Sequence, residues 1–181
     1  NLANAPHAQN MYLVQDIVVN HMGNYFSMRG NGSNGFAASD YRPEPVTKQG
    51  HAPSQYPFNM NNAQDPKQQS LGIYHWTPNI TDYSNAKQEH NYQMAGLDDL
   101  NTENPLVREA LRQSYGYWIK AVGVDAFRVD TAFYVPADFF RDFLYSTDPK
   151  APGIVEVAKQ TGRGAFHVFG EGFAIDKAFE D

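Results

Sequence analysis

Three short apolar segments of the chain end in polar residues that a buried core would normally exclude. The segments span 11–20, 124–130 and 167–171, and the polar residues at or just beyond their ends are Asn20, His21, Arg128, Asp130 and Glu171. Parallel strands bring their carboxyl ends to one edge of a sheet, and sites form there. If these segments are parallel strands, we therefore expect the polar side chains to converge.

Two carboxylates in this set could perform acid–base and nucleophilic chemistry together. Alone, either acid would more often be a helix cap or a solvated loop residue. Arg128 precedes Asp130 by two residues, so strand alternation places both on one side, where the guanidinium would hold Asp130 ionised. Glu171 lies between Gly170 and Gly172, which permit close backbone approach and an unusual turn. One ionised and one protonated carboxyl group, about 5–5.5 Å apart, is the arrangement required for retaining glycoside hydrolysis.

The elements that must position these residues form an α/β pattern. The three apolar segments lack polar alternation, which is typical of strands buried in a parallel sheet. Helices are predicted from near Pro136 and over about 153–160, which makes a strand–helix–strand unit. A longer helix is predicted to be capped by Asn104, with Pro105 at its first position and its exit at Gly123. Its predicted apolar stripe is Leu106, Ala110, Leu111, Trp118, Ile119 and Val122.

Residues 22–103 have a different composition. They are rich in Asn, Gly, Pro, Tyr and Gln and contain no stretch with helical periodicity. A connection of this length is far longer than an ordinary crossover between strands. We therefore expect an irregular subdomain, inserted after the first strand.

Composition excludes several classes of function. A net charge of −6 argues against a nucleic-acid partner, which would require a basic surface. No apolar run approaches the roughly 18 residues that cross a bilayer, so no membrane partner is expected. The absence of cysteine rules out disulfides and thiolate metal sites.

No basic-then-apolar leader follows Asn1, which indicates an export signal that is either removed or absent. An extracellular or periplasmic location is slightly favoured over a cytoplasmic one.

Four segments, in this order, resemble the short conserved motifs of the alpha-amylase family of glycoside hydrolases. They are DIVVNH at 16–21, GLDDLN at 96–101, GVDAFRVD at 123–130 and FGE at 169–171. An 80-residue insertion follows the first motif, where the family has its B domain. The resemblance covers nearly the whole chain.

This resemblance implies a fold and a division of the chain. The family fold is a (β/α)8 TIM barrel of about 250 residues before insertions. The chain would supply a partial barrel: strand 3 within 1–21, an irregular inserted B subdomain at 22–103, and strands 4 and 5 with their helices at 104–181. The missing later strands carry a further family carboxylate, so we expect the 181 residues alone to be inactive.

The resemblance also implies a role for each site residue. Asp130 would be the nucleophile and Glu171 the general acid/base, and catalysis would proceed by double displacement through a glycosyl-enzyme intermediate. Arg128 would position Asp130, and His21 would contact the sugar ring being cleaved. Asp16 would brace its strand end. The substrate would be an alpha-glucan: a starch-like polymer, a maltooligosaccharide or a cyclodextrin.

The match departs from the family pattern after the nucleophile. A Lys-His pair is common there, but this chain has Phe133 and Tyr134. Phe133 would stack on the acceptor sugar instead, which resembles the cyclomaltodextrinase and neopullulanase side of the family. No cofactor is expected to be required. Where members of the family bind calcium, the corresponding oxygen ligands here would be Asn20 and Asp99.

Three other interpretations stay open. The glycosyl group could pass to a sugar rather than to water, which would make the protein a transglycosylase. A non-catalytic barrel relative could serve as a binding or partner-docking module, although such relatives lose catalytic groups that are present here. An unrelated nucleotide-binding α/β protein has little support, because no Gly-rich phosphate motif follows a strand.

Overall fold

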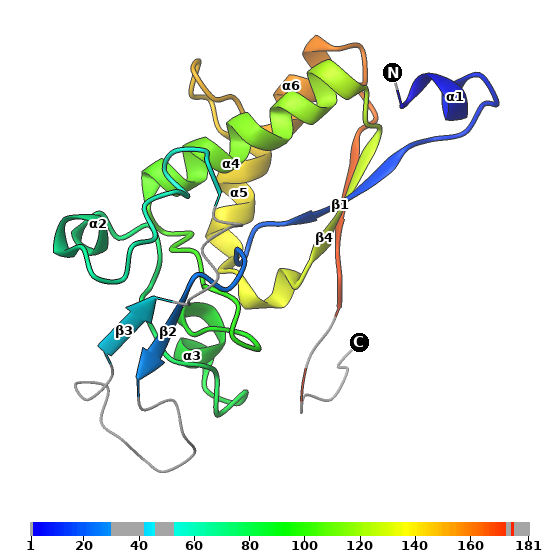
Figure 1. Cartoon of the computed structure of the whole chain (residues 1–181). Coiled ribbons are helices and arrows are strands. Elements are labelled where there is room, and N and C mark those ends of the chain that lie inside the picture. Colours follow the sequence, from blue (N-terminus) through cyan, green and yellow to red (C-terminus); the bar gives the residue numbers. More distant parts are fainter. Residues whose placement is uncertain (1, 30–41, 46–52, 173–174, 176–181) are drawn as a thin grey trace. The chain divides into compact units, whose positions relative to one another are not determined.

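The computed structural model describes residues 2–29, 42–45, 53–172 and 175 (Figure 1). The chain divides into two compact units. The first comprises Asn1–Val19 and Arg108–Phe173, and the second comprises Asn20–Val107 and Ala174–Asp181. Each unit is described separately below.

The first unit is built on a parallel sheet of three strands. The strands are β1 (Val14–Val18), β4 (Ala126–Asp130) and β5 (His167–Gly170), in the order β1-β4-β5. All three predicted strands are confirmed, although β1 begins three residues later and ends two residues earlier than expected. The α/β class is therefore confirmed for this unit.

Among the described residues, one face of this sheet is covered. Ile17, Phe127 and Val129 are buried, whereas Val14 and Phe169 are exposed and belong to the opposite face. Tyr115 meets Phe127 and Phe143 edge to face on the covered side. Within the described residues, the three strands are therefore buried on the face that Phe127 shares.

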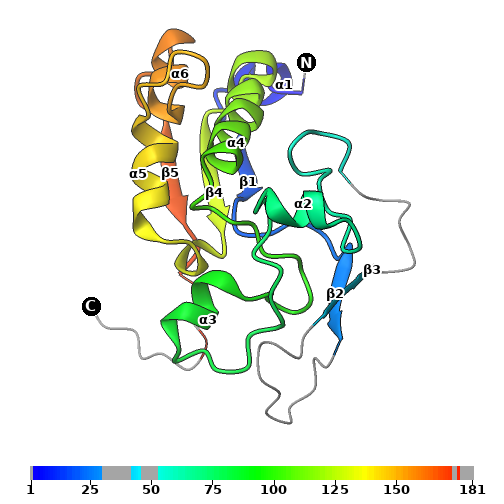
Figure 2. The ribbon, with the colours of Figure 1, turned by 90° about the vertical axis from the view of Figure 1, so that its left-hand side faces the viewer.

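Three helices form that covering layer (Figure 2). They are α4 (Pro105–Tyr117), α5 (Ala137–Tyr145) and α6 (Ile154–Gln160). A short helix α1 (Asn4–His7) precedes β1. The helices predicted near Pro136 and over 153–160 are confirmed. Among the described residues, no helix is both long enough and apolar enough to pass through a membrane.

The start and exit of α4 follow the sequence signals, but its buried face does not. Asn104 Oδ1 accepts from the N–H of Leu106 at 2.9 Å, and Gly123 ends the helical run with a φ of 87°. The last turn, η3 (Trp118–Val122), is a π-helix. Leu106 and Trp118 are 38% and 40% exposed, so the predicted stripe is wrong at these two positions. Leu106 lies in the first turn of α4 and Trp118 at the start of the π-helical turn, so both deviations are at the ends of α4.

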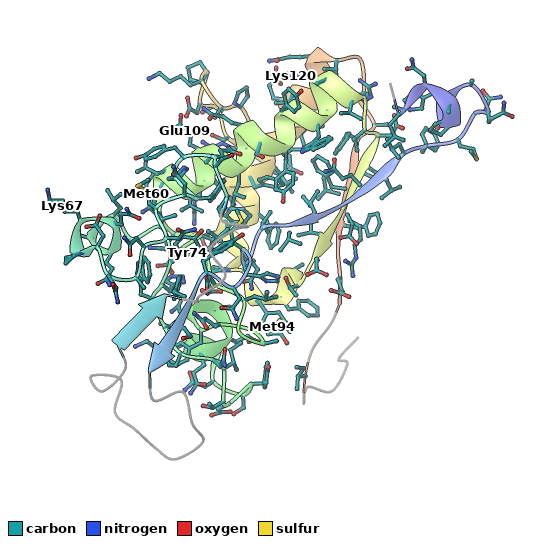
Figure 3. All side chains as sticks on the ribbon, in the orientation of Figure 1. Met60, Lys67, Tyr74, Met94, Glu109 and Lys120 are labelled. Atoms are coloured by element: carbon teal, nitrogen blue, oxygen red, sulfur yellow. The ribbon has the colours of Figure 1, made fainter. Side chains whose placement is uncertain are left out.

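The second unit contains short elements. They are the antiparallel pair β2 (Phe26–Arg29) and β3 (Arg42–Pro45), and the helices α2 (Pro66–Ser70) and α3 (Ala86–Asn91). Phe26 and Tyr74 are buried in its core and meet edge to face with ring centroids 5.6 Å apart. Tyr74 is labelled in Figure 3. The two short helices correct the expectation of a region without helices. Each is capped by a side chain, Asp65 for α2 and Asn85 for α3.

Candidate active site

A single guanidinium group connects three carboxylates on the exposed face of the sheet. Arg128 Nη1 lies 2.9 Å from both oxygens of Asp16 and 2.9 Å from Asp130 Oδ1. Arg128 Nη2 lies 2.5 Å from Glu171 Oε1. The hydrogen bond with Asp16, followed by that with Asp130, raises the pKa of Arg128 above its ordinary value. Arg128 is thus a fixed positive charge between the two candidate catalytic acids.

Strand register explains how Asp130 and Glu171 come together. β4 and β5 pair in parallel with Arg128 opposite Phe169 and Val129 opposite Gly170, so Glu171 follows at the level of Asp130. Neighbouring strands lie about 4.8 Å apart, and side chains at one level share a face. The two ends of one planar guanidinium reach both acids, so Asp130 Oδ1 and Glu171 Oε1 lie within about 8 Å of each other. The convergence expected of these two residues and Arg128 is confirmed.

Both oxygens of Glu171 are held. Besides the ion pair to Oε1, the backbone N–H of Thr131 donates to Oε2 at 3.1 Å. The N–H of Glu171 itself donates to the carbonyl of Val129 at 2.8 Å, which anchors its backbone to β4. Thr131 adopts a left-handed conformation with φ 50° and ψ 36°, which is uncommon for a β-branched residue. These contacts fix the rotation of the carboxyl group as well as its position.

Gly170 is required by a close approach between the ends of β4 and β5. A Cβ at this position would lie 2.7 Å from the Cβ of Ala132, nearer than two carbons can pack. The close approach expected of the glycine before Glu171 is therefore confirmed. The unusual backbone conformation, however, is found at Thr131 and not at Gly170.

Within the described residues, the side chains of Asp130 and Glu171 are 28% and 30% exposed. Phe133 lies in the short 3-10 helix η4 (Ala132–Tyr134), directly after the turn, with half its surface exposed. A separate cavity of about 530 Å³ lies beside α5 and α6, and none of its lining residues belongs to the candidate site.

The other predicted site residues belong to the second unit, where the structure brings them together. His21 pairs with Asp99 in an isolated antiparallel bridge, and the carbonyl of Asn20 accepts from Leu100 N–H at 2.9 Å. Asn20 is buried, and its side-chain nitrogen lies 3.3 Å from His21 Nδ1. His21 is partly exposed, as a residue that contacts substrate must be.

Two neighbouring carboxylates of this unit are buried. Burial raises the pKa of Asp99 to about 7, although Oδ2 lies 2.5 Å from His75 Nδ1. Burial also raises the pKa of Asp98 to about 7, opposed by backbone hydrogen bonds from Tyr25 and Phe26. Asp99 Oδ1 is buried and has no hydrogen-bond partner within the described ranges. The described residues contain no group of three or more His, Cys, Asp or Glu side chains arranged to hold a metal.

Thr131 is the functional residue that sequence reasoning did not identify. Nothing in its type indicates a left-handed conformation, since glycine or asparagine would be expected there. Its N–H bonds to Glu171 only because β5 pairs with β4 in this register.

Asp16 was expected to brace the strand end, and its contact with Arg128 agrees with that role.

Comparison with known proteins identifies relatives of this chain. Residues 1–162 match the family model described as alpha amylase, catalytic domain. Over 146 residues the chain is 30% identical to a beta/alpha-amylase of Paenibacillus polymyxa, covering 78% of this chain and 10% of that protein. It is 29% identical over 164 residues to a cyclomaltodextrin glucanotransferase of Klebsiella oxytoca, covering 91% of this chain and 21% of the relative.

A solved structure shares the fold. The alpha-amylase from Geobacillus thermoleovorans, complexed with acarbose, matches with a TM-score of 0.61 and 23% identity. The match covers 96% of this chain and 28% of that structure. The chain thus spans between a tenth and about a quarter of the length of these three proteins.

Proposed function

Because this chain belongs to the alpha-amylase family, we propose that it forms part of a retaining glycoside hydrolase that cleaves alpha-glucosidic bonds. The observation that carries the proposal is the bridge that Arg128 makes between Asp130 and Glu171 on neighbouring parallel strands. A retaining mechanism needs two carboxyl groups about 5–5.5 Å apart, and the spacing of adjacent strands supports such a separation.

The two acids divide the chemistry between them. Asp130, held by Arg128, attacks the anomeric carbon and forms a glycosyl ester, while Glu171 gives its proton to the departing glycosidic oxygen. Glu171 then accepts a proton from the incoming water, which displaces Asp130 from the sugar. Two inversions at one carbon leave its configuration unchanged. When a sugar hydroxyl replaces water in the second step, the same residues perform transglycosylation.

The proposal also assigns the elements to a barrel. β1, β4 and β5 would be strands 3, 4 and 5 of a (β/α)8 barrel, and residues 22–103 would be the inserted B subdomain. The parallel order β1-β4-β5, with helices on one face, supports this assignment. The domain boundaries at 21 and 103 stay predictions, and most of the chain beyond 172 lies outside the described residues.

Substrate roles follow from the chemistry of the exposed residues. His21 would donate a hydrogen bond to the sugar whose linkage is cleaved, and Phe133 would offer a ring face to the acceptor sugar. The ring of Phe133 is half exposed and lies four residues or fewer from both Asp130 and Thr131 in the chain. Both observations support a stacking contact with the acceptor sugar. The substrates would be starch-like glucans, maltooligosaccharides or cyclodextrins, and the relation to a cyclomaltodextrin glucanotransferase supports this class.

The stereochemistry of the product tests the mechanism. The full-length protein that carries this chain is incubated with maltopentaose, and the first product is followed by proton NMR before mutarotation. The α-anomer should appear first, and a fluorinated slow substrate should label the peptide containing Asp130. Initial release of the β-anomer, or label on another residue, would contradict the proposed roles. Adding a sugar acceptor in excess separates hydrolysis from transfer.

The 181 residues alone should be inactive. The chain spans only 10% and 21% of two relatives, and a further family carboxylate belongs to a later strand that this chain does not supply. We expect the isolated chain to cleave maltopentaose at a rate indistinguishable from buffer. Turnover comparable to that of the full-length protein would disprove this expectation.

Calcium is a proposed ligand of the second unit. Asp99 Oδ1 is a buried oxygen that lacks a hydrogen-bond partner in the described part of the chain, and the buried Asn20 lies on a neighbouring segment. Carboxylate and amide oxygens fit calcium, which here would link the two segments and stabilise the fold. No required cofactor is proposed for the chemical step.

Calcium binding has a thermal signature. At a calcium concentration about 100 times Kd, the full-length protein should gain about 2.7 kcal/mol of stability, which EDTA removes. Magnesium at the same concentration is the control cation. Asp99→Asn should abolish the calcium effect, whereas Glu103→Gln, at an exposed acid of the same unit, should preserve it. An unfolding midpoint that does not respond to calcium in the wild-type protein would refute this proposal.

A further inference from the structure

The turn that follows Asp130 contains a conformation that the chain adopts at a cost. Thr131 is left-handed and β-branched, and its side chain is buried. Its Oγ1 has no hydrogen-bond partner among the residues that the structure describes, so the side chain gains no bond that would offset the strain. The gain must therefore be sought in the backbone of this residue.

The backbone N–H of Thr131 leaves the strand ladder. The N–H of Glu171 donates to Val129, as a parallel ladder requires. In a continued ladder the next donor, Thr131 N–H, would bond to the backbone carbonyl of Glu171. It bonds instead to the side chain of that residue, at Oε2. At this turn one N–H thus leaves the ladder and bonds to the side chain of the candidate acid/base.

We propose that Thr131 is a positioning residue for Glu171. Arg128 Nη2 holds Oε1 and Thr131 N–H holds Oε2, so the plane of the carboxyl group is fixed by two donors, one on β4 and one in the turn that follows it. A carboxyl group fixed in this way presents one defined edge to the glycosidic oxygen. This inference rests on the proposed function, because it assigns a purpose to the orientation of the acid/base.

The contact between Gly170 and Ala132 holds this turn in place. Ala132 directly follows Thr131, and its Cβ occupies the space where a side chain at position 170 would lie. Any Cβ at position 170 would push Ala132 away and carry Thr131 N–H with it. The contact joins two side-chain positions, so removing one Cβ can make room for the other.

A compensating pair of variants in the full-length protein tests the proposal. Gly170→Ala should lower kcat for maltopentaose by about 10- to 100-fold. The added methyl group would displace Ala132 and Thr131, and misplacing a positioning group by about 1 Å has effects of this magnitude. KM should stay within about threefold. Gly170→Ala combined with Ala132→Gly should recover kcat to within about threefold of the Ala132→Gly single variant. Gly164→Ala, where a Cβ meets nothing within 4 Å, is the matched control and should keep the parental kcat.

Two further measurements separate positioning from loss of structure. Loss of an N–H donor disfavours the ionised carboxylate, so the alkaline limb of the kcat profile of Gly170→Ala should move to higher pH. The loss in kcat should also be smaller for 4-nitrophenyl maltooligosaccharides, whose leaving group needs little protonation. Equal losses on both substrates with an unmoved alkaline limb would indicate a merely structural effect and overturn the proposal.

Other outcomes are equally decisive. Parental kcat in Gly170→Ala, or a loss that Ala132→Gly does not reverse although the unfolding midpoint recovers, would overturn the role of Thr131. Glu171→Gln distinguishes failure of the positioning role from failure of the proposed function. If Glu171→Gln is inactive while Gly170→Ala has parental kcat, the positioning role of Thr131 is wrong and the acid/base role of Glu171 stands. A fully active Glu171→Gln would contradict the proposed function itself.

Discussion

Asp130→Asn in the full-length protein is expected to lower kcat for maltooligosaccharide cleavage by about 10⁴-fold or more. An amide oxygen of the same size can still accept from Arg128 Nη1, which lies 2.9 Å from Oδ1, so the local structure should persist. The amide cannot form the glycosyl ester on which double displacement depends. Initial rates on maltopentaose, together with an unchanged unfolding midpoint, check this result.

The matched control is another aspartate bound by an arginine. Asp138 pairs with Arg108 Nη2 at 2.7 Å, and its side chain is 67% exposed on α5. Asp138→Asn should leave kcat unchanged and cost at most about 1 kcal/mol of stability, as exposed ion pairs contribute little. An Asp130→Asn variant as active as this control would revive the interpretation of a non-catalytic barrel relative.

Glu171→Gln distinguishes the acid/base from the nucleophile. General acid–base catalysis contributes about 10²–10⁴-fold, so a loss of that size is expected for maltopentaose. The loss should shrink for 4-nitrophenyl substrates in the first step, because their leaving group departs without a proton. Asp130→Asn should show no such dependence on the leaving group. Identical behaviour of the two variants would contradict the division of roles.

Arg112→Met is expected to lower the free energy of unfolding by about 1.5–3 kcal/mol, the usual contribution of hydrogen bonds made by a charged group. Arg112 lies on α4 and is 5% exposed. Its guanidinium donates to the carboxylate of Asp142 on α5 and, at 2.7 Å, to the carbonyl of Ala151. It also lies 3.6 Å from Asp148. Methionine fills similar volume but takes this donor from the carbonyl of Ala151 and from two partly exposed carboxylates.

Urea denaturation of the full-length protein measures this cost, and the same helix supplies a control. Arg108, one turn earlier on α4, pairs with the exposed Asp138, so Arg108→Met should cost only about 1 kcal/mol. Equal effects of the two variants would show that burial of the Arg112 pair is not what holds α4, α5 and the 146–153 segment together.

Secondary structure was predictable where local signals are strong. The three strands were found because apolar runs of this length are typical of parallel sheets, and α4 was found from the capping signals at Asn104, Pro105 and Gly123. The helices α2 and α3 were missed because five or six residues are too few to show an apolar stripe. Their caps, Asp65 before Pro66 and Asn85, were the available signal.

Burial was predicted less well, for reasons outside any local pattern. Phe169 was assigned to a buried strand but is 52% exposed among the described residues, whose helices cover the opposite face of the sheet. Trp118 was assigned to the buried stripe of α4 but is 40% exposed, at the position where the helix becomes π-helical. The local geometry of a helix and the packing of helices on a sheet both depend on contacts between elements far apart in the chain.

The shared face of Arg128 and Asp130 follows from the amino-acid sequence alone, since alternation along a strand is a local property. The level position of Glu171 and Asp130, and the bridge that Arg128 makes between them, could not be predicted in this way, because the register between β4 and β5 is set by pairing across 41 positions of chain. The same strand pairing places the N–H of Thr131 beside Glu171, and no residue type in the sequence predicts this contact. The types and strand faces of these residues are local properties of the sequence. The contacts between them depend on a strand register that forms only when the sheet is assembled.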